Sequence, residues 1–306
     1  MSALEVLRPG TQSLLQDAGR RGWQHLGLSP AGPLDLHAAA WANHLLGNPW
    51  GTPLLEVCMG DLQLRAELDT WVAVCGADLP IERDGEPLRN WSRFPLHAGQ
   101  TLRLGFARSG VRAYLAVAGG FVTQPVLGSV ACQLREGLGG LDGCGQALRA
   151  GDRLRCKAAV LTGTASVPWP YVPDYRCPAL LRVIVGGDAV EFVEDELQGF
   201  FERDWQVAEA DRMGVRLLGE PMQAPRRQWS QGVADGAIQL PPDGQPIILM
   251  ADRQTMGGYP LIGWLHPLDH ARLAQCPTRH RLRFTPVSLG DAQAELREFY
   301  HFFGKP

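Results

Sequence analysis

Short apolar runs recur along the whole chain, and most of them end at glycine or proline. Runs of this length between such breakers are typical of β-strands. The pattern predicts strands at Leu54–Val57, Leu62–Arg65, Trp71–Val74, Thr101–Leu104, Ala113–Val117, Leu180–Val185, Ala237–Leu240, Ile247–Ala251 and Arg281–Phe284. With 36 glycines and 23 prolines as punctuation, the chain is expected to be mainly β, as in many-stranded sandwiches and barrels.

Helical spacing is rarer. The clearest case is Leu34–Leu46, with Pro33 in its first turn and Gly47 at its end, which are the residues that favour a helix start and stop. Leu34, Ala38, Trp41 and Leu45 form its apolar stripe. Further helices are expected near Ala189–Arg203, Leu268–Gln275 and Asp291–Phe303.

The 306 residues exceed what one compact core usually holds, so two domains are expected. Four prolines lie between Ser166 and Pro178, which indicates a stiff linker. The predicted division is an N-terminal domain at 1–168, a Pro-rich linker at 169–178 and a C-terminal domain at 179–306.

Composition narrows the class of protein. Charged residues make up 20% and the net charge is −3, with no dense basic arm, so we expect no nucleic-acid partner. The start MSALEVLRPG lacks an apolar core behind basic residues, and the longest uncharged stretch is broken by glycine. We therefore expect a cytoplasmic protein with no membrane partner. The seven cysteines contain no C-x-x-C pair, which fits reduced thiols rather than a zinc site.

Lysine is nearly absent. Only Lys157 and Lys305 occur, and the other basic residues are arginines. No G-x-x-x-x-G-K-[ST] segment exists, which excludes a P-loop. Neither lysine stands in a Met-Lys setting, so this chain is expected to carry no attached biotin.

Two polar groups in the first half are candidate site residues. In Gln16–Gly22 (QDAGRRG), Asp17 and Arg20 either pair across a glycine-rich turn or present Arg20 to a carboxylate or phosphate. At the predicted helix, Asp35 lies near the start and Asn43 two turns on. Asp35 suits a helix N-terminus by its charge alone, so a structural role stays open for all of these residues.

A third group lies at Gly236–Pro260, where an apolar strand runs directly into polar residues. Buried polar groups are costly unless partners or a ligand satisfy them. The segment therefore predicts a ligand site, and an internal ion-pair network is the alternative. Its candidate residues are Gln239, Asp252, Arg253, Gln254, Thr255, Gly257, Gly258 and Tyr259.

The segment HPLDH (His266–His270) places two histidines four residues apart. Such a pair binds metal when a third ligand stands in a recognisable motif, and none is found. We expect two helix-surface histidines and no metal site.

Longer motifs resemble a known family. They are QDAGRRGWQHLGLSPAGPLD, AAAWANHLLGNP, LLEVCMG, DRMGVRLLG and SQGVADGAIQLPPDGQPIILMADRQTMGGYP. In this order they resemble the allophanate hydrolase subunit 2 family, a biotin-dependent carboxyltransferase-like family. It includes the C subunit of bacterial 5-oxoprolinase, the Kip-type antagonist and part of the carboxyltransferase region of urea carboxylase.

The resemblance implies two cyclophilin-like β-barrel domains with a few short helices. It also implies a hydrolase subunit that works with two others, a B-type subunit (Kip inhibitor-like) and an A-type subunit, and that is inactive without them. In that scheme 5-oxo-L-proline is activated with ATP and then opened to L-glutamate. ATP, with Mg²⁺ implied, is expected at the complex with the B-type subunit.

Two other functions stay open. One is carboxyl transfer to urea or a related amide, with biotin carried on another protein. The other is a non-catalytic Kip-type antagonist that binds a kinase inhibitor.

For the catalytic roles we predict Asp252, Arg253 and Asp35. Arg253 would hold an anionic group, and Asp252 would orient that arginine or a substrate N–H. The predicted substrate-binding residues are Arg20, Asp17, Asn43, Gln239, Gln254, Thr255, Gly257, Gly258 and Tyr259.

The chain departs from the family pattern at three places. Val130, Ala131 and Cys132 replace an arginine and two hydroxyl residues, Gln146 replaces an arginine, and Gln231 replaces a glutamate. Loss of a guanidinium removes a bidentate anion contact, which weakens the case for the first-domain half of a phosphate or carboxylate site.

Overall fold

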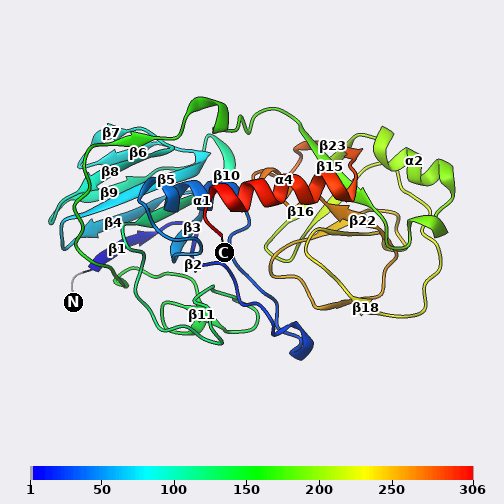
Figure 1. The fold of residues 1–306 in the computed structure, drawn as a ribbon, viewed down its shortest axis with the longest axis horizontal. Helices are drawn as coiled ribbons and strands as arrows, with labels where there is room; N and C mark the ends of the chain where they lie inside the picture. The colour runs from blue at the N-terminus through cyan, green and yellow to red at the C-terminus, as the bar shows by residue number, and fades with distance from the viewer. Residues whose placement is uncertain (1–2, 306) are drawn as a thin grey trace. The chain divides into compact units, whose positions relative to one another are not determined.

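The structure is a computed structural model that describes residues 3–305, and it confirms the mainly β architecture expected from the sequence. The chain forms two compact units (Figure 1). Of the described residues, the first unit takes 3–20, 31–176 and 303–305, and the second takes 21–30 and 177–302. Each unit is therefore assembled from more than one stretch of chain.

The segment expected to be a linker belongs to the first unit as far as Arg176. It contains the short 3₁₀ helix η2 (Trp169–Tyr171), and Tyr175 is buried in a core cluster of that unit. The chain passes from the first unit to the second between Arg176 and Cys177.

Two six-stranded sheets build the first unit. The first sheet runs in the order β13 (Arg153–Arg155), β1 (Ala3–Pro9), β4 (Leu62–Ala66), β9 (Thr101–Leu104), β6 (Ile81–Arg83) and β7 (Glu86–Leu88). The second runs β14 (Ala165–Ser166), β8 (Ser92–Leu96), β5 (Thr70–Asp78), β10 (Ser109–Val117), β3 (Leu54–Cys58) and β2 (Gln12–Gln16). One core joins them, since Leu64 and Leu102 of the first cluster with Val72 and Leu115 of the second. Two parallel strands, β11 (Gly139–Gly140) and β12 (Cys144–Gln146), form a separate small sheet next to β2.

Helix α1 (Leu36–Leu45) packs on β5 and β10 through small residues. Ala38 and Ala42 cluster with Ala73 of β5 and Ala116 of β10. Methyl side chains on both sides allow a close approach of helix and sheet. The helix begins two residues later than the apolar pattern predicted, because Asp35 caps it by accepting a hydrogen bond from the Ala38 N–H (2.8 Å).

The second unit is a closed seven-stranded barrel. Its order is β15 (Ala179–Val185), β22 (Leu261–Leu265), β19 (Ala237–Gln239), β20 (Ile247–Leu249), β17 (Gly214–Leu218), β16 (Trp205–Ala210) and β23 (Arg281–Pro286). The parallel pairing of β15 with β23 joins the two ends of the sheet, so no strand edge of the barrel is left open. The remaining elements are η1 (Gln24–Leu26), η3 (Ala189–Glu191), α2 (Glu194–Glu202), α3 (Asp269–Ala274), α4 (Leu289–Phe302) and the pair β18 (Gln231–Gly232) with β21 (Met256–Gly257).

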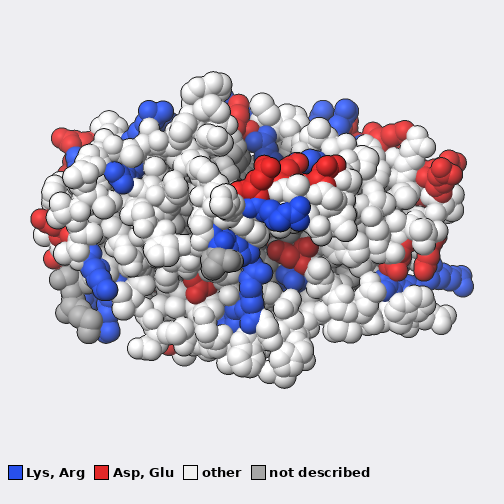
Figure 2. All heavy atoms as spheres, viewed as in Figure 1, with Lys and Arg blue, Asp and Glu red and all other residues white. Residues whose placement is uncertain are grey.

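The surface carries charges of both signs. On the face drawn in Figure 2, acidic and basic residues are interspersed among uncharged ones. Across residues 3–305, none of the helices combines the length and the apolar composition that a membrane crossing requires.

His37 of α1 generates a prediction about pH. Its Nε2 accepts a hydrogen bond from the Trp41 indole N–H (3.1 Å), and burial lowers its pKa to about 4 from the ordinary 6.5. Between these two values the unfolded chain binds a proton that the folded chain does not. The stability that neutral His37 contributes is therefore complete above pH 6.5 and is lost as the pH falls toward 4.

We expect the free energy of unfolding to fall by about 2 kcal/mol more in the wild type than in His37→Gln between pH 7 and pH 5. Glutamine keeps an acceptor for Trp41 but has no titratable ring. Urea denaturation at the two pH values measures the difference, and equal losses in both proteins would show that His37 is not the group responsible.

Candidate functional site

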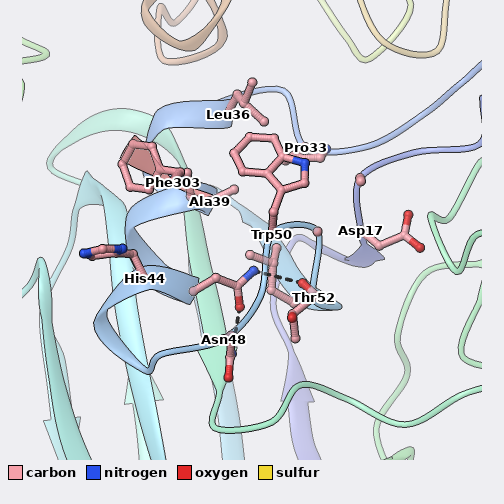
Figure 3. Close-up of a pocket in the computed structure, with 14 residues that line it drawn as sticks. Asp17, Pro33, Leu36, Ala39, His44, Asn48, Trp50, Thr52 and Phe303 are labelled. Carbon is pink, nitrogen blue, oxygen red and sulfur yellow. Dashed lines mark hydrogen bonds between the residues drawn. The ribbon is translucent and has the colours of Figure 1, made fainter. Parts of the chain in front are cut away.

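The first unit has a pocket beside α1, here called the Trp50 pocket (Figure 3). Rings and aliphatic side chains make most of its wall. Its lining includes Asp17, Pro33, Leu36, Ala39, Asn43, His44, Asn48, Trp50, Thr52 and Phe303. A mainly apolar concave wall with a few polar groups is typical of a small-molecule site.

The amides in the Trp50 pocket bind the protein itself. Asn43 Nδ2 donates to the Thr52 carbonyl (2.9 Å), and Asn48 Nδ2 donates to Asn43 Oδ1 (2.8 Å). Asn48 Nδ2 also donates to the Val117 carbonyl at the end of β10 (2.9 Å). Asn43 thus lies at a pocket, as predicted for a substrate-binding residue, but its side chain holds the 48–52 loop against α1.

Asp17 and Arg20 fasten one loop to another. The Asp17 carboxylate accepts hydrogen bonds from the Ser129 hydroxyl (2.5 Å) and the Val130 N–H (2.8 Å). Arg20 is 1% exposed, and it donates to the carbonyls of Val126 and Ala131, both at 3.0 Å. These contacts give both side chains a structural role. The pairing of Asp17 with Arg20 and the binding of an anion by Arg20 stay predictions.

The same contacts bear on the unusual GSVACQ segment. Val130 and Ala131 meet Asp17 and Arg20 through backbone atoms, so their changed side chains leave these bonds in place. Cys132 uses its carbonyl to accept from Gln16 Nε2 (3.0 Å). The departures from the family pattern therefore keep the loop intact while removing side-chain donors.

Asp35 lies in the protein interior with no exposed surface. Its carboxylate caps α1 and accepts from the Tyr175 hydroxyl (3.2 Å). Its N–H donates to the Tyr114 hydroxyl (2.7 Å), which in turn donates to Glu56 Oε2 (2.8 Å). These are the contacts of a structural residue, and the catalytic role assigned from the sequence stays a prediction.

In the second unit Asp252 forms a buried ion pair with Arg212. The two bonds, from Nε and Nη2 of Arg212 to the two carboxylate oxygens, are both 2.9 Å. The sequence predicted a strand over Ile247–Ala251, but β20 ends at Leu249 and a turn follows. Asp252 and Gln254 therefore lie beyond the strand, in the loop that leads to β21.

Arg253 also faces the interior. It donates to the carbonyls of Val233 and Met250, both at 3.3 Å, and lies 3.5 Å from Asp235. Burial lowers the pKa of Arg253 and the Asp235 carboxylate raises it. The internal network that the sequence left as an alternative is what surrounds this arginine.

The prediction of two helix-surface histidines is wrong. His266 has no exposed surface, and His270 is 8% exposed. His266 Nδ1 accepts from the Leu268 N–H (3.1 Å), and His270 Nδ1 lies 3.6 Å from Asp235 Oδ2. Helix α3 begins only at Asp269, so His266 precedes it and faces the core.

Three of the remaining candidates, Gln239, Gln254 and Tyr259, line a second cavity, here called the Gln239 pocket. It is lined by Arg216, Gln239, Ile247, Leu249, Gln254 and Tyr259, together with Glu209, Ala210, Asp211, Met213 and Gly214. Gly257 of β21 lies over the Gln239 amide, because a Cβ there would be 2.3 Å from Nε2. Gly258 lines a neighbouring hollow, and Thr255 precedes β21. Arg216 and Arg212 were missed by the sequence reasoning, although both stand in the DRMGVRLLG motif.

Comparisons with known proteins agree with the motif resemblance. The family model described as carboxyltransferase domain, subdomain A and B, matches residues 26–286. The chain is 35% identical to the C subunit of 5-oxoprolinase from Escherichia coli (strain K12), over 98% of this chain and 96% of that protein. It is 33% identical to the C subunit of 5-oxoprolinase from Haemophilus influenzae, over 96% and 94%.

Solved structures share the fold. The Kluyveromyces lactis urea carboxylase matches 97% of this chain with a TM-score of 0.87 and 26% identity, and this chain covers 29% of that one. Another solved protein matches 93% of this chain with a TM-score of 0.83 and 34% identity, and is covered over 56% of its length. The chain thus corresponds to only part of these longer proteins.

The buried pair generates a stability prediction. Asp252→Asn leaves Arg212 charged and buried without its carboxylate, which should lower the free energy of unfolding by about 3–5 kcal/mol. Asp243→Asn is the control, because the Arg216–Asp243 pair is 37% and 47% exposed and should change stability by about 1 kcal/mol or less. Urea denaturation of both variants measures the two changes. An equally small decrease in the free energy of unfolding in both variants would show that the buried pair contributes no more to stability than the exposed one.

Proposed function

Because the chain belongs to the carboxyltransferase domain family, subdomains A and B, we propose that it is the C subunit of an ATP-dependent 5-oxoprolinase. The observation that carries the proposal is the length of the match. Two proteins named as the C subunit of 5-oxoprolinase are matched over 96% and 94% of their length. The urea-related relatives are covered over only 26% and 17%.

The proposed reaction opens a stable amide. Water adds to the lactam carbonyl of 5-oxo-L-proline, the ring C–N bond breaks and L-glutamate forms. ATP would supply the phosphoryl group that activates the lactam oxygen. ADP is released at that transfer, and a second water then takes up the phosphoryl group, which leaves as phosphate. The energy of that transfer offsets the low reactivity of an unstrained amide.

Within this chain we assign substrate contact to the Gln239 pocket. Gln239, Gln254 and Tyr259 offer hydrogen-bonding groups there, beside the apolar side chains of Ile247 and Leu249. Asp252 and Arg253 act as positioning residues, since their bonds fix the turn that leads into Gln254.

Partner subunits complete the proposed enzyme. The two relatives are named as subunits, and this chain has neither a P-loop nor a lysine-rich segment to hold a nucleotide. We therefore assign ATP and its Mg²⁺ to the complex with a B-type, Kip inhibitor-like subunit, while an A-type subunit completes hydrolysis. We also propose that the complex works in the cytoplasm.

A second candidate function rests on the urea-related relatives. The chain is 30% identical to the putative urea carboxylase of Emericella nidulans. A carboxyltransferase acting on urea, with biotin carried by another protein, is the alternative that this likeness supports. A Kip-type antagonist without catalysis is the third.

We expect ATP-dependent conversion of 5-oxo-L-proline to L-glutamate only when this chain is combined with the A-type and B-type subunits. The chain alone should show none, and omission of the chain should abolish turnover. Release of ADP and glutamate measures the activity. Carboxylation of urea after a biotinylated carrier protein and its biotin carboxylase are added, with no glutamate formed, would replace the proposal with its alternative.

A further inference from the structure

The Gln239 pocket holds a buried amide group that the protein leaves unused. Gln239 is 1% exposed, and its Nε2 has no hydrogen-bond partner within residues 3–305. A buried unsatisfied donor is destabilising, and native proteins satisfy nearly all such groups. A ligand that supplies the partner removes this cost.

Arg216 lies in the same row of the barrel sheet. Ile247 of β20 pairs with Arg216 on β17 and with Gln239 on β19. Directly opposed residues share a face of a sheet, so the guanidinium, the isoleucine and the amide stand side by side. All three line the Gln239 pocket.

Arg216 keeps donors available to a ligand. Its Nη2 pairs with Asp243, and its side chain is 37% exposed. No other partner of this guanidinium is found within the described part of the chain. A carboxylate placed over Ile247 would accept charge-assisted hydrogen bonds from it.

The row fixes where a shared ligand would lie. Two strand intervals, about 9.6 Å, separate the backbones of Arg216 and Gln239. A ligand that both side chains hold would therefore lie over Ile247, the residue between them.

The hydrogen-bonding groups of the Gln239 amide favour a ligand that contains a cyclic amide. A primary carboxamide presents C=O and N–H side by side, and it is complementary to a ligand whose own N–H and C=O lie on the same edge. Open-chain secondary amides are trans and present these groups on opposite sides, whereas a five-membered lactam is held cis.

We infer that the Gln239 pocket binds a small lactam carrying a carboxylate, with the Gln239 amide paired to the cis-amide edge and Arg216 to the carboxylate. The inference rests on the proposed function and deepens it, because it assigns substrate selection to two residues. Urea also carries an N–H and a C=O on one side and could pair with the Gln239 amide. It has no carboxylate for Arg216, so it would make only one of the two contacts.

The test is direct binding to the full chain labelled with ¹⁵N. We expect 5-oxo-L-proline to shift the Gln239 side-chain amide signals in a saturable way, with the signals identified by their absence in Gln239→Leu. Addition of 2-pyrrolidinone, a lactam without the carboxylate, should shift them with lower affinity. N-methylacetamide, a trans amide, should leave them unmoved.

The variants separate the two contacts. Gln239→Leu should weaken binding of both lactams by about tenfold, as expected for one lost hydrogen-bonded group. Arg216→Gln should weaken the binding of 5-oxo-L-proline by a similar factor and leave the affinity for 2-pyrrolidinone unchanged. Gln198→Leu, at an exposed glutamine on α2 that donates to Glu202, is the matched control and should bind like the wild type.

Gly257→Ala gives a second route if Gln239→Leu does not fold. Its Cβ would lie 2.3 Å from Gln239 Nε2, so it should displace the amide and weaken lactam binding as well. Unchanged affinity in these variants, shifts confined to the Trp50 pocket, or no binding of 5-oxo-L-proline would each overturn the inference. Lactam binding at Gln239 without turnover in the complete complex would instead count against the proposed function alone.

Discussion

The buried ion pair between Arg212 and Asp252 is the interaction on which the second unit's site depends. Removing two charges from water is costly, and only good geometry repays it. Here both carboxylate oxygens are met at 2.9 Å, and the Asp252 N–H also donates to the Arg212 carbonyl (2.8 Å). The pair ties the segment before β17 to the end of β20. The loop that follows can then bring Gly257 over Gln239.

The first unit also buries polar and charged groups, at the start of α1. Asp35, Tyr114 and Glu56 form a hydrogen-bonded chain in the interior, where each group would be costly alone. Burial raises the pKa of Tyr114, and the charge of Glu56 raises it further. The neutral phenol therefore stays a donor to Glu56, and the helix start is fixed at one place on the sheet.

Features that depend on neighbouring residues could be predicted from the sequence. Runs such as Thr101–Leu104 became strands because breakers bound them on both sides, and helices formed near all four expected segments. Contacts between distant residues could not be read in this way. No residue near Asp252 in the sequence indicates that Arg212 is its partner. The ring of His266 likewise lies beside Arg182 and Glu295, which are far from it along the chain.

In the candidate site, too, residues close together in the sequence could be predicted and a residue from a distant strand could not. Gln239, Gln254 and Tyr259 were selected because they cluster in one polar segment, and the structure brings them to one cavity, with Gly257 over the Gln239 amide. Arg216 was not predicted as a site residue, because an isolated arginine in a strand of alternating polar and apolar residues is usually a solvent-exposed side chain. Only the pairing of β17 with β20 puts it in the row of Gln239.

The path of the chain through the two units has an evolutionary consequence. Residues 21–30 belong to the second unit and 303–305 to the first, so the backbone passes between them four times. A single recombination point would give each descendant an incomplete copy of both. The units are therefore expected to be inherited as one cassette, whether it stands alone or is carried within a longer gene.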